Sequence, residues 1–143
     1  MKTISRRVSR EDGVAAVELA LILPVLFLIL FGTLEFGRVW SQYQLFQGAA
    51  REGARCAAVA STSSCDVQPR IDQAADPYDP DPDATIEILD SSGAVLWTRA
   101  DGCEAADKGK DVRVSWEQQL QVNIPFWNNV TLTPTIKAVF RCE

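Results

Sequence analysis

An unbroken apolar segment near the N-terminus dominates the pattern of hydrophobic and polar positions. Residues 14–34 read VAAVELALILPVLFLILFGTL, and Glu18 is the only charged residue among them. A run of about 20 apolar residues is long enough to cross a bilayer as a helix. The pattern therefore predicts a membrane-spanning helix, in which Pro24 removes one hydrogen bond and is expected to cause a kink.

The helical pattern continues beyond the apolar segment. Residues 35–60 contain no proline, and small or apolar residues recur there at three- and four-residue steps. A continuous helix over residues 14–60 would be about 70 Å long at 1.5 Å per residue. Because its first half is apolar all round and its second half is amphipathic, we expect residues 14–34 to lie in a membrane and residues 35–60 to enter a domain core.

The remaining sequence predicts a linker and then a sheet. Residues 61–83 are expected to be an Asp/Pro-rich linker and loop. Their tail DPYDPDPDA is expected to be extended and solvated, because it carries proline at every second or third position. From residue 84 the apolar period becomes two, which is typical of β-strands. We expect an α+β fold, with a long N-terminal helix followed by a small antiparallel sheet domain at residues 84–143. The predicted strands lie around residues 86–88, 95–97, 112–124 and 136–142, the last beginning at a sheet edge beside Pro134.

Charge is distributed unevenly along the chain. Residues 1–13 carry four basic and two acidic side chains, whereas residues 14–143 carry ten basic and seventeen acidic ones. A basic segment before an apolar helix predicts a cytoplasmic N-terminus and an exported C-terminal domain. The net charge of −5 disfavours a nucleic-acid partner, because phosphate binding needs a basic surface. The alternative, a cleaved secretory signal peptide, is disfavoured by the long apolar run and by the lack of a small-x-small site after it.

Histidine and cysteine usage limits the chemistry. The chain has no histidine, which excludes Ser-His-Asp and Cys-His catalysis and most zinc sites, so we expect no enzyme activity, cofactor or metal centre. All four cysteines lie beyond the apolar segment. An even number in an exported region predicts two disulfides. Of the three possible pairings we favour Cys56 with Cys65, which closes a short loop, and hence Cys103 with Cys142; buried free thiols are the alternative.

Two further patterns are weaker. Asp79, Asp81 and Asp83 have the spacing of a calcium loop, but Ala84 replaces the glycine that the loop requires, so a solvated loop is favoured. Three tryptophans could form a ligand platform, although positions in the core of the sheet are favoured. These tryptophans are Trp97, Trp116 and Trp127.

The junction between the leader and the apolar segment carries the most informative polar residue. Glu18 lies alone in an apolar helix, where a charge costs about 2–3 kcal/mol on insertion scales. Cleavage after Gly13 would create an amine at Val14, about one turn from Glu18, and this amine could offset the charge on the same chain or on a neighbour. The alternative is that Glu18 reaches the cytoplasmic interface. Glu35 and Arg38 are expected to pair just outside the bilayer, or to contact charges on neighbouring subunits.

These features resemble the TadE-like proteins, pilin-like components of the tight adherence (Tad, or Flp) pilus system of bacteria. The resemblance rests on the Gly13 junction, Glu18, Pro24 and two later stretches, GTLEFGR at residues 32–38 and AAREGARCAA at residues 49–58. It covers about residues 10–60 and is weak over the sheet domain. The resemblance implies a pilin-like fold, in which residues 1–13 are a prepilin-type leader, cut by a prepilin peptidase between Gly13 and Val14.

The resemblance also implies a function. Glu18 matches the acidic residue five positions after the cut, which in pilins assists processing or subunit assembly. Leu19 stands where the main Flp pilins usually have tyrosine, which favours a minor pilin or pseudopilin acting in pilus assembly, adhesion or secretion. Its partners would be the inner membrane, the peptidase, other Tad pilins and assembly-platform proteins. The alternative is a membrane-anchored periplasmic binding module that joins no filament.

Overall fold

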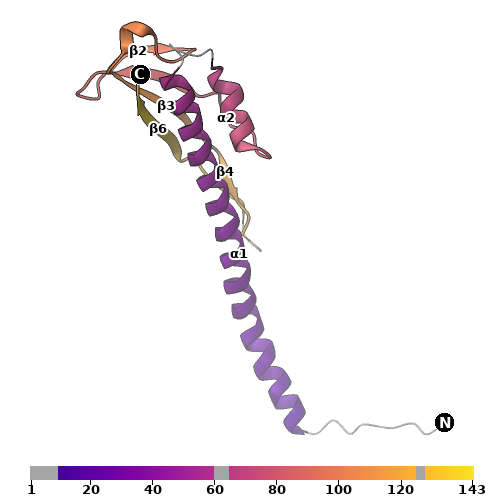
Figure 1. Cartoon of the computed structure of the whole chain (residues 1–143). Helices are drawn as coiled ribbons and strands as arrows, with labels where there is room; N and C mark the ends of the chain where they lie inside the picture. Colours follow the sequence, from indigo (N-terminus) through magenta and orange to yellow (C-terminus); the bar gives the residue numbers. More distant parts are fainter. Residues whose placement is uncertain (1–9, 60–64, 125–127) are drawn as a thin grey trace, which may run out of the picture.

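One long helix is the central element of the structure. The computed structural model describes residues 10–59, 65–124 and 128–143, so most of the leader and Trp127 lie outside the described residues. Helix α1 (Arg10–Ala58) continues through Pro24 without a break. Its 49 residues make it about 70 Å long. Figure 1 shows its N-terminal half projecting away from the domain, while α2 and the strands gather around its C-terminal half. The predicted long helix is therefore confirmed.

The projecting half of α1 is bare. It contains a segment long and apolar enough to cross a membrane, and nothing in the described chain buries its most apolar 18-residue window. Large apolar side chains point outward on all sides of it, for example Leu21 at 73 % exposure and Leu28 at 65 %. A helix that is apolar all round needs lipid or other apolar helices around it.

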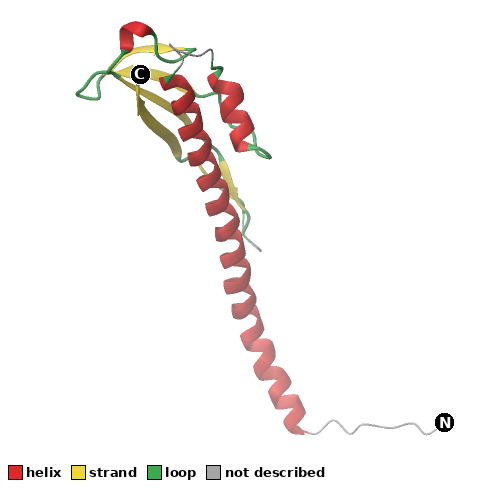
Figure 2. Cartoon of the chain, in the orientation of Figure 1, coloured by secondary structure: helices red, strands yellow, loops and turns green. Residues whose placement is uncertain are grey.

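A four-stranded antiparallel sheet packs against the other half of α1 (Figure 2). Its spatial order is β2 (Val95–Arg99), β1 (Thr85–Leu89), β3 (Asp111–Glu117) and β6 (Thr135–Arg141). One face of the sheet is buried against α1, and the cross-strand pairs Ile88↔Val112 and Ile86↔Val114 lie on it. Together with the helix, this sheet confirms the α+β class. Strands β1, β2 and β6 lie in three of the four predicted strand regions, with β6 at an edge after Pro134.

The long strand predicted over residues 112–124 is wrong, because the chain leaves the sheet at Gln118. Strand β3 ends at Glu117, and β4 (Leu120–Val122) pairs with β5 (Val130–Leu132) in a separate two-stranded sheet beside α1. The buried Gln118 accepts a 2.9 Å hydrogen bond from the indole N–H of Trp116, which satisfies both polar groups where the strand ends. A single polar residue in an apolar alternation therefore marks the break.

The prediction that residues 61–83 are only a linker and loop is also wrong, because they contain helix α2 (Val67–Ala75). Its one proline, Pro69, lies in the first turn. Proline is tolerated there, because backbone N–H groups in the first turn make no hydrogen bond within the helix. Apolar residues spaced by four bury one face of α2 against α1; they are Val67, Ile71 and Ala75. The Gln68 side chain bonds Asp72 within α2 and the Ala84 N–H at the start of the sheet.

The C-terminal end of α1 is fixed by the rest of the domain. The Ala57 carbonyl accepts a 2.9 Å hydrogen bond from Cys103 N–H, and the Ala58 carbonyl accepts one of 3.3 Å from Glu143 N–H. These bonds satisfy carbonyls that a helix end leaves free. Gly102 makes the approach possible, because its φ is +91° and a Cβ there would lie 2.6 Å from the Ala57 oxygen.

Candidate functional site

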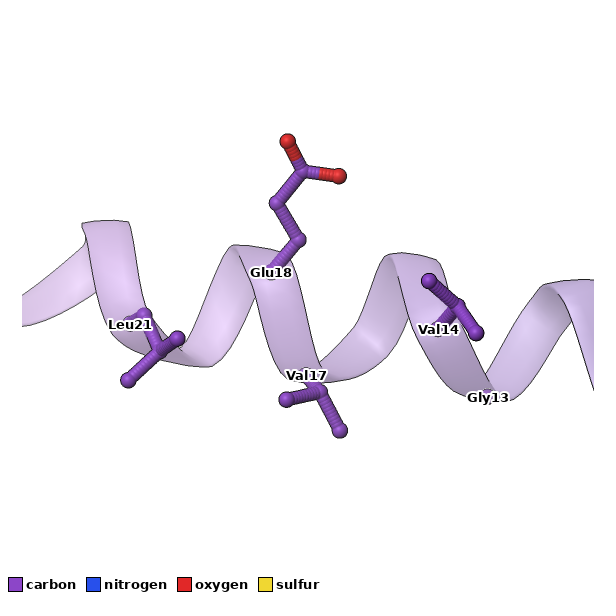
Figure 3. A pocket seen from close by; sticks show the side chains of 5 residues that line it. All are labelled: Gly13, Val14, Val17, Glu18 and Leu21. Atoms are coloured by element: carbon purple, nitrogen blue, oxygen red, sulfur yellow. The ribbon is translucent and has the colours of Figure 1, made fainter.

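The residues of the predicted processing site form the exposed N-terminal part of α1. Figure 3 shows Val14 and Glu18 on the same side of the helix, one turn apart, with Val17 pointing the other way. Val14 is 69 % exposed and Val17 is 62 % exposed. Within the described residues the Glu18 carboxylate makes no hydrogen bond or ion pair. The described part of the fold therefore supplies no partner for this charge.

Gly13 is not required by the described fold. A Cβ built on it meets nothing within 4 Å, and its backbone is helical. Glycine in a helix costs about 0.5–1 kcal/mol relative to alanine, and no contact within the described residues requires a glycine here.

Glu35 and Arg38 form a bidentate ion pair just beyond the apolar segment. The Arg38 guanidinium donates to both carboxylate oxygens of Glu35, at 2.6 and 3.0 Å. Both side chains also bind the β4 region: Arg38 donates to the Gln121 carbonyl at 3.0 Å, and Glu35 accepts from the Asn123 N–H at 2.7 Å. The predicted pair thus exists, and its observed second role is to fasten the hairpin to α1. The further hypothesis that it contacts other subunits stays a prediction.

These hydrogen bonds change the acidity of Glu35. The bond from Arg38 and then the bond from Asn123 N–H lower the pKa of Glu35 from 4.5 to about 2, because both stabilise the charged form. The same contact raises the pKa of Arg38. Glu35 therefore stays ionised at pH values at which an unpaired glutamate would be protonated.

The stretch AAREGARCAA forms the packing surface of the outer domain. Its small residues Ala49, Ala50, Ala54 and Ala57 are fully buried. Gly53 faces α2 so closely that a Cβ would lie 2.4 Å from the Ile71 side chain. This second stretch of the family resemblance therefore explains how α2 and the sheet pack closely on α1.

Both disulfides lie at the distal end of the domain. Cys56 pairs with Cys65, at a Cα–Cα distance of 5.6 Å, and Cys103 pairs with Cys142 at 5.8 Å. This is the pairing that the sequence analysis favours. The first bridge joins the end of α1 to the start of the α2 segment, and the second joins the loop before β3 to the C-terminus. The first bridge therefore restrains the chain where it leaves α1, and the second restrains the loop whose Cys103 N–H binds the Ala57 carbonyl.

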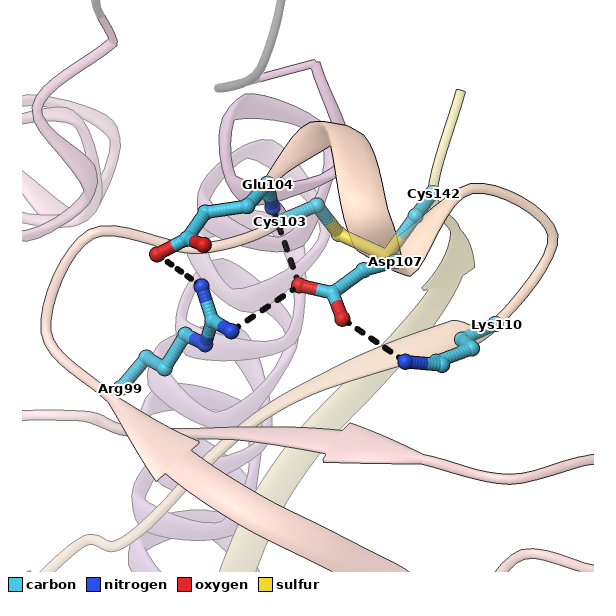
Figure 4. A network of polar contacts seen from close by, with 6 residues as sticks. All are labelled: Arg99, Cys103, Glu104, Asp107, Lys110 and Cys142. Carbon is cyan, nitrogen blue, oxygen red and sulfur yellow. Dashed lines mark hydrogen bonds and ion pairs between the residues drawn. A yellow bond between two sulfur atoms is a disulfide. The ribbon is translucent and has the colours of Figure 1, made fainter.

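The sequence analysis missed a buried carboxylate beside the second disulfide (Figure 4). Asp107 is fully buried and binds Lys110 at 3.0 Å, Arg99 at 3.5 Å and the Glu104 N–H at 3.0 Å. Burial raises its pKa, but the Glu104 bond, Lys110 and Arg99 together outweigh this and lower it. A carboxylate three residues after Glu104 is the spacing of a capping box, which is the signal that could have found it.

The weaker patterns have different outcomes. Trp116 lies in the core, as favoured, whereas Trp97 is 36 % exposed and lies under the Lys110 ammonium, 4.1 Å from the ring centroid. Trp127 is outside the described residues. In the described part of the chain, no group of three potential ligands could hold a metal ion.

Comparison with known families concerns α1 alone. Residues 13–55 match the family model described as TadE-like protein. This helix is TadE-like. The match confirms the resemblance over the apolar segment, the Glu35–Arg38 pair and most of the small-residue stretch, and it ends before the sheet domain. The comparisons with curated proteins and with solved structures found no match.

Proposed function

We propose that this chain is a minor pilin or pseudopilin of a Tad pilus, with a structural rather than an enzymatic role. One observation carries the proposal: the TadE-like match covers the whole bare segment of α1 and begins at Gly13. A bare apolar helix needs two things that a pilin-type subunit meets in turn, lipid before assembly and neighbouring helices after it.

The N-terminus is cytoplasmic and the disulfide-bonded domain is periplasmic in this proposal. The basic residues before α1 support the orientation, since positive charge stays on the cytoplasmic side. Two disulfides at the far end of the domain support an oxidising compartment there. The domain is then carried into a pilus when the helix leaves the membrane.

A prepilin peptidase cuts between Gly13 and Val14 in the proposed pathway. The described fold has no steric need for Gly13, which supports its recognition by an enzyme subsite that accepts only a small residue. The new amine of Val14 then lies one turn from Glu18, on the same side of the helix. Paired with Glu18 of an adjoining subunit, it fixes the axial register of two helices. Pro24 lies further along α1, where neighbouring helices pack around the missing hydrogen bond.

The mature N-terminus tests the proposal. The chain is expressed with the peptidase of its own pilus system, and the intact mass of the membrane-bound product is measured. The expected product begins at Val14. Gly13→Leu should block the cut, whereas the control Gly32→Leu should not, because Gly32 is also an exposed helical glycine with no neighbour within 4 Å. A chain that keeps Met1 in the presence of active peptidase contradicts the proposal and supports a membrane-anchored binding module instead.

A further inference from the structure

The hairpin formed by β4 and β5 differs in composition from the rest of the domain. Residues 118–136 contain no charged side chain, although 23 % of the chain is Asp, Glu, Lys or Arg. Polar groups in this stretch are only amides and hydroxyls. Such a composition suits a surface that meets an apolar or zwitterionic environment rather than bulk water.

The hydrogen bonds to α1 fix the level of this hairpin along the helix. Gln121 binds Arg38 and Asn123 binds Glu35, so β4 descends toward the apolar segment as the chain proceeds. Glu35 is the first residue after residues 14–34, and one helical residue rises 1.5 Å. If that segment spans a bilayer, Asn123 lies at the membrane surface, and Ile124 is the next residue in the descending direction.

Exposed apolar side chains gather at the same level. Ile124 is 40 % exposed and Val130, opposite Val122 in the hairpin, is 44 % exposed. On α1, Phe36 and Trp40 are 67 % and 54 % exposed and stack at 6.1 Å, about 3 and 9 Å above the apolar segment. The polar interfacial layer of a bilayer is about 5–8 Å thick on each side, and Trp is enriched in it. The Trp40 backbone lies at the outer edge of this layer, and its side chain is directed back toward the helix N-terminus, into the layer.

We infer that the β4–β5 hairpin rests on the outer lipid interface of the membrane from which α1 emerges, with Ile124 and Val130 in the interfacial layer beside Trp40. The occupant is lipid because the surface is continuous with the apolar helix and lacks charge. The Glu35–Arg38 pair then has a mechanical role, because it holds the hairpin at the correct depth. This inference rests on the membrane-anchored state in the proposed function.

The consequence is a domain held at a fixed orientation before assembly. An anchor of one helix alone leaves the domain free to tilt, whereas a second contact beside it restricts the tilt. Leaving the membrane then requires the hairpin surface to lose its lipid contact, so that it becomes available to helices of neighbouring subunits.

Fluorescent labels on matched positions test the contact. The full chain is reconstituted into vesicles of phosphatidylcholine and phosphatidylglycerol, with a single added cysteine carrying an environment-sensitive dye. Ile124→Cys is compared with Leu96→Cys, since the two residues are 40 % and 41 % exposed. Val130→Cys is compared with Val95→Cys, at 44 % and 46 % exposure. Both controls lie on β2, in the four-stranded sheet rather than in the hairpin.

Lipids with a nitroxide near the headgroup should roughly halve the emission of labels at 124 and 130, because these labels lie within the interfacial layer, and leave labels at 96 and 95 unchanged. Equal behaviour of both members of each pair overturns the inference. The inference is also overturned if the dyes at 124 and 130 are not quenched by the nitroxide lipids and respond only when pilin subunits are added. That result would favour a helix as the occupant of this surface. Resistance of the chain to carbonate extraction is measured in parallel. A chain that is extracted contradicts the membrane anchor in the proposed function. A chain that resists extraction but shows no quenching contradicts only the contact between the hairpin and the lipid.

Discussion

The Glu35 carboxylate accepts a 2.7 Å hydrogen bond from the backbone N–H of Asn123, 88 residues further along the chain. This bond joins the first polar turn above the apolar segment to the end of β4. Arg38 orients the carboxylate and binds Gln121 as well, so two adjacent turns of α1 hold two points of one strand. The part of the domain nearest to the apolar segment is thus fastened to the TadE-like helix by residues within that helix.

Removal of this carboxylate should loosen the hairpin and leave the rest of the domain intact. In Glu35→Ala, amides of β4 and β5 are expected to exchange hydrogen faster, because the Asn123 N–H loses its acceptor and Arg38 its orienting partner. Exchange in α2 and the four-stranded sheet should not change. Glu52→Ala on the same helix is the control. Hydrogen–deuterium exchange by mass spectrometry measures both, and equal protection of the hairpin in wild type and Glu35→Ala would show that these bonds do not hold it.

The same contact predicts a specific dependence on pH. Folding lowers the pKa of Glu35 from 4.5 to about 2, so its ionised form favours the fastened state. This contribution is fully present above about pH 4.5 and is lost as the pH falls toward 2. The NMR shift of the Asn123 amide should titrate within that range in the full chain in micelles. Arg38→Gln should move the midpoint upward, because Arg38 makes the largest contribution to the lowered pKa.

Two glycines on α1 should respond in opposite directions to the same substitution. Gly53→Ala is expected to destabilise the domain by about 1–3 kcal/mol, because the new Cβ would lie 2.4 Å from Ile71. Gly48→Ala should be neutral or stabilising by up to about 1 kcal/mol, because nothing lies within 4 Å and alanine favours the helix. Urea unfolding of the full chain in detergent measures both. Equal effects would contradict the close packing of α2 on α1.

Asp107 is expected to matter for stability rather than for function. Asp107→Asn leaves Lys110 without its counter-charge and Arg99 with Glu104 alone, beside a buried amide, which should cost about 1–3 kcal/mol, since both cations remain partly exposed. Asp101→Asn lies in the same loop, is exposed, and should change the free energy of unfolding by less than about 0.5 kcal/mol. The midpoint of urea unfolding reports the difference. A loss of pilus assembly at unchanged stability would instead assign Asp107 to an interface.

The features that could be predicted from the sequence depend on long, regular patterns. The apolar run, the extension of the helix toward Ala58 and the two-residue period of the sheet each repeat over many residues, so one exception does not hide them. Helix α2 was missed because Pro69 and the prolines that follow it suggest a loop, although a proline in a first turn permits a helix. The hairpin contacts of Glu35 were missed because no local pattern links residues 88 apart in the sequence. Helical spacing identifies the pairing partner of Glu35 three residues away, but not the strand that packs beside it.

The charge of Glu18 should be needed for assembly but not for insertion or folding. No described residue pairs with this carboxylate, so the proposed partner is the Val14 amine of an adjoining processed subunit. Glu18→Ala should insert at least as well as wild type, because it removes a group that costs about 2–3 kcal/mol in the membrane. The outer domain should remain folded, since Cys56 lies about 60 Å away along the helix.

Cross-linking to other pilus subunits, and the count of pili per cell, measure the loss that we expect. Glu18→Gln is the sharper variant, because it keeps the shape and hydrogen-bonding capacity of the side chain and removes only the charge. Val17→Ala, on the other side of the helix, is the control for a change of side-chain size and should assemble normally. An ion pair between subunits fixes one axial register, so even a neutral isostere should permit slippage and reduce assembly. Wild-type levels of pili in both Glu18→Gln and Glu18→Ala, with normal processing, would show that the carboxylate only reaches the membrane interface and sets no register.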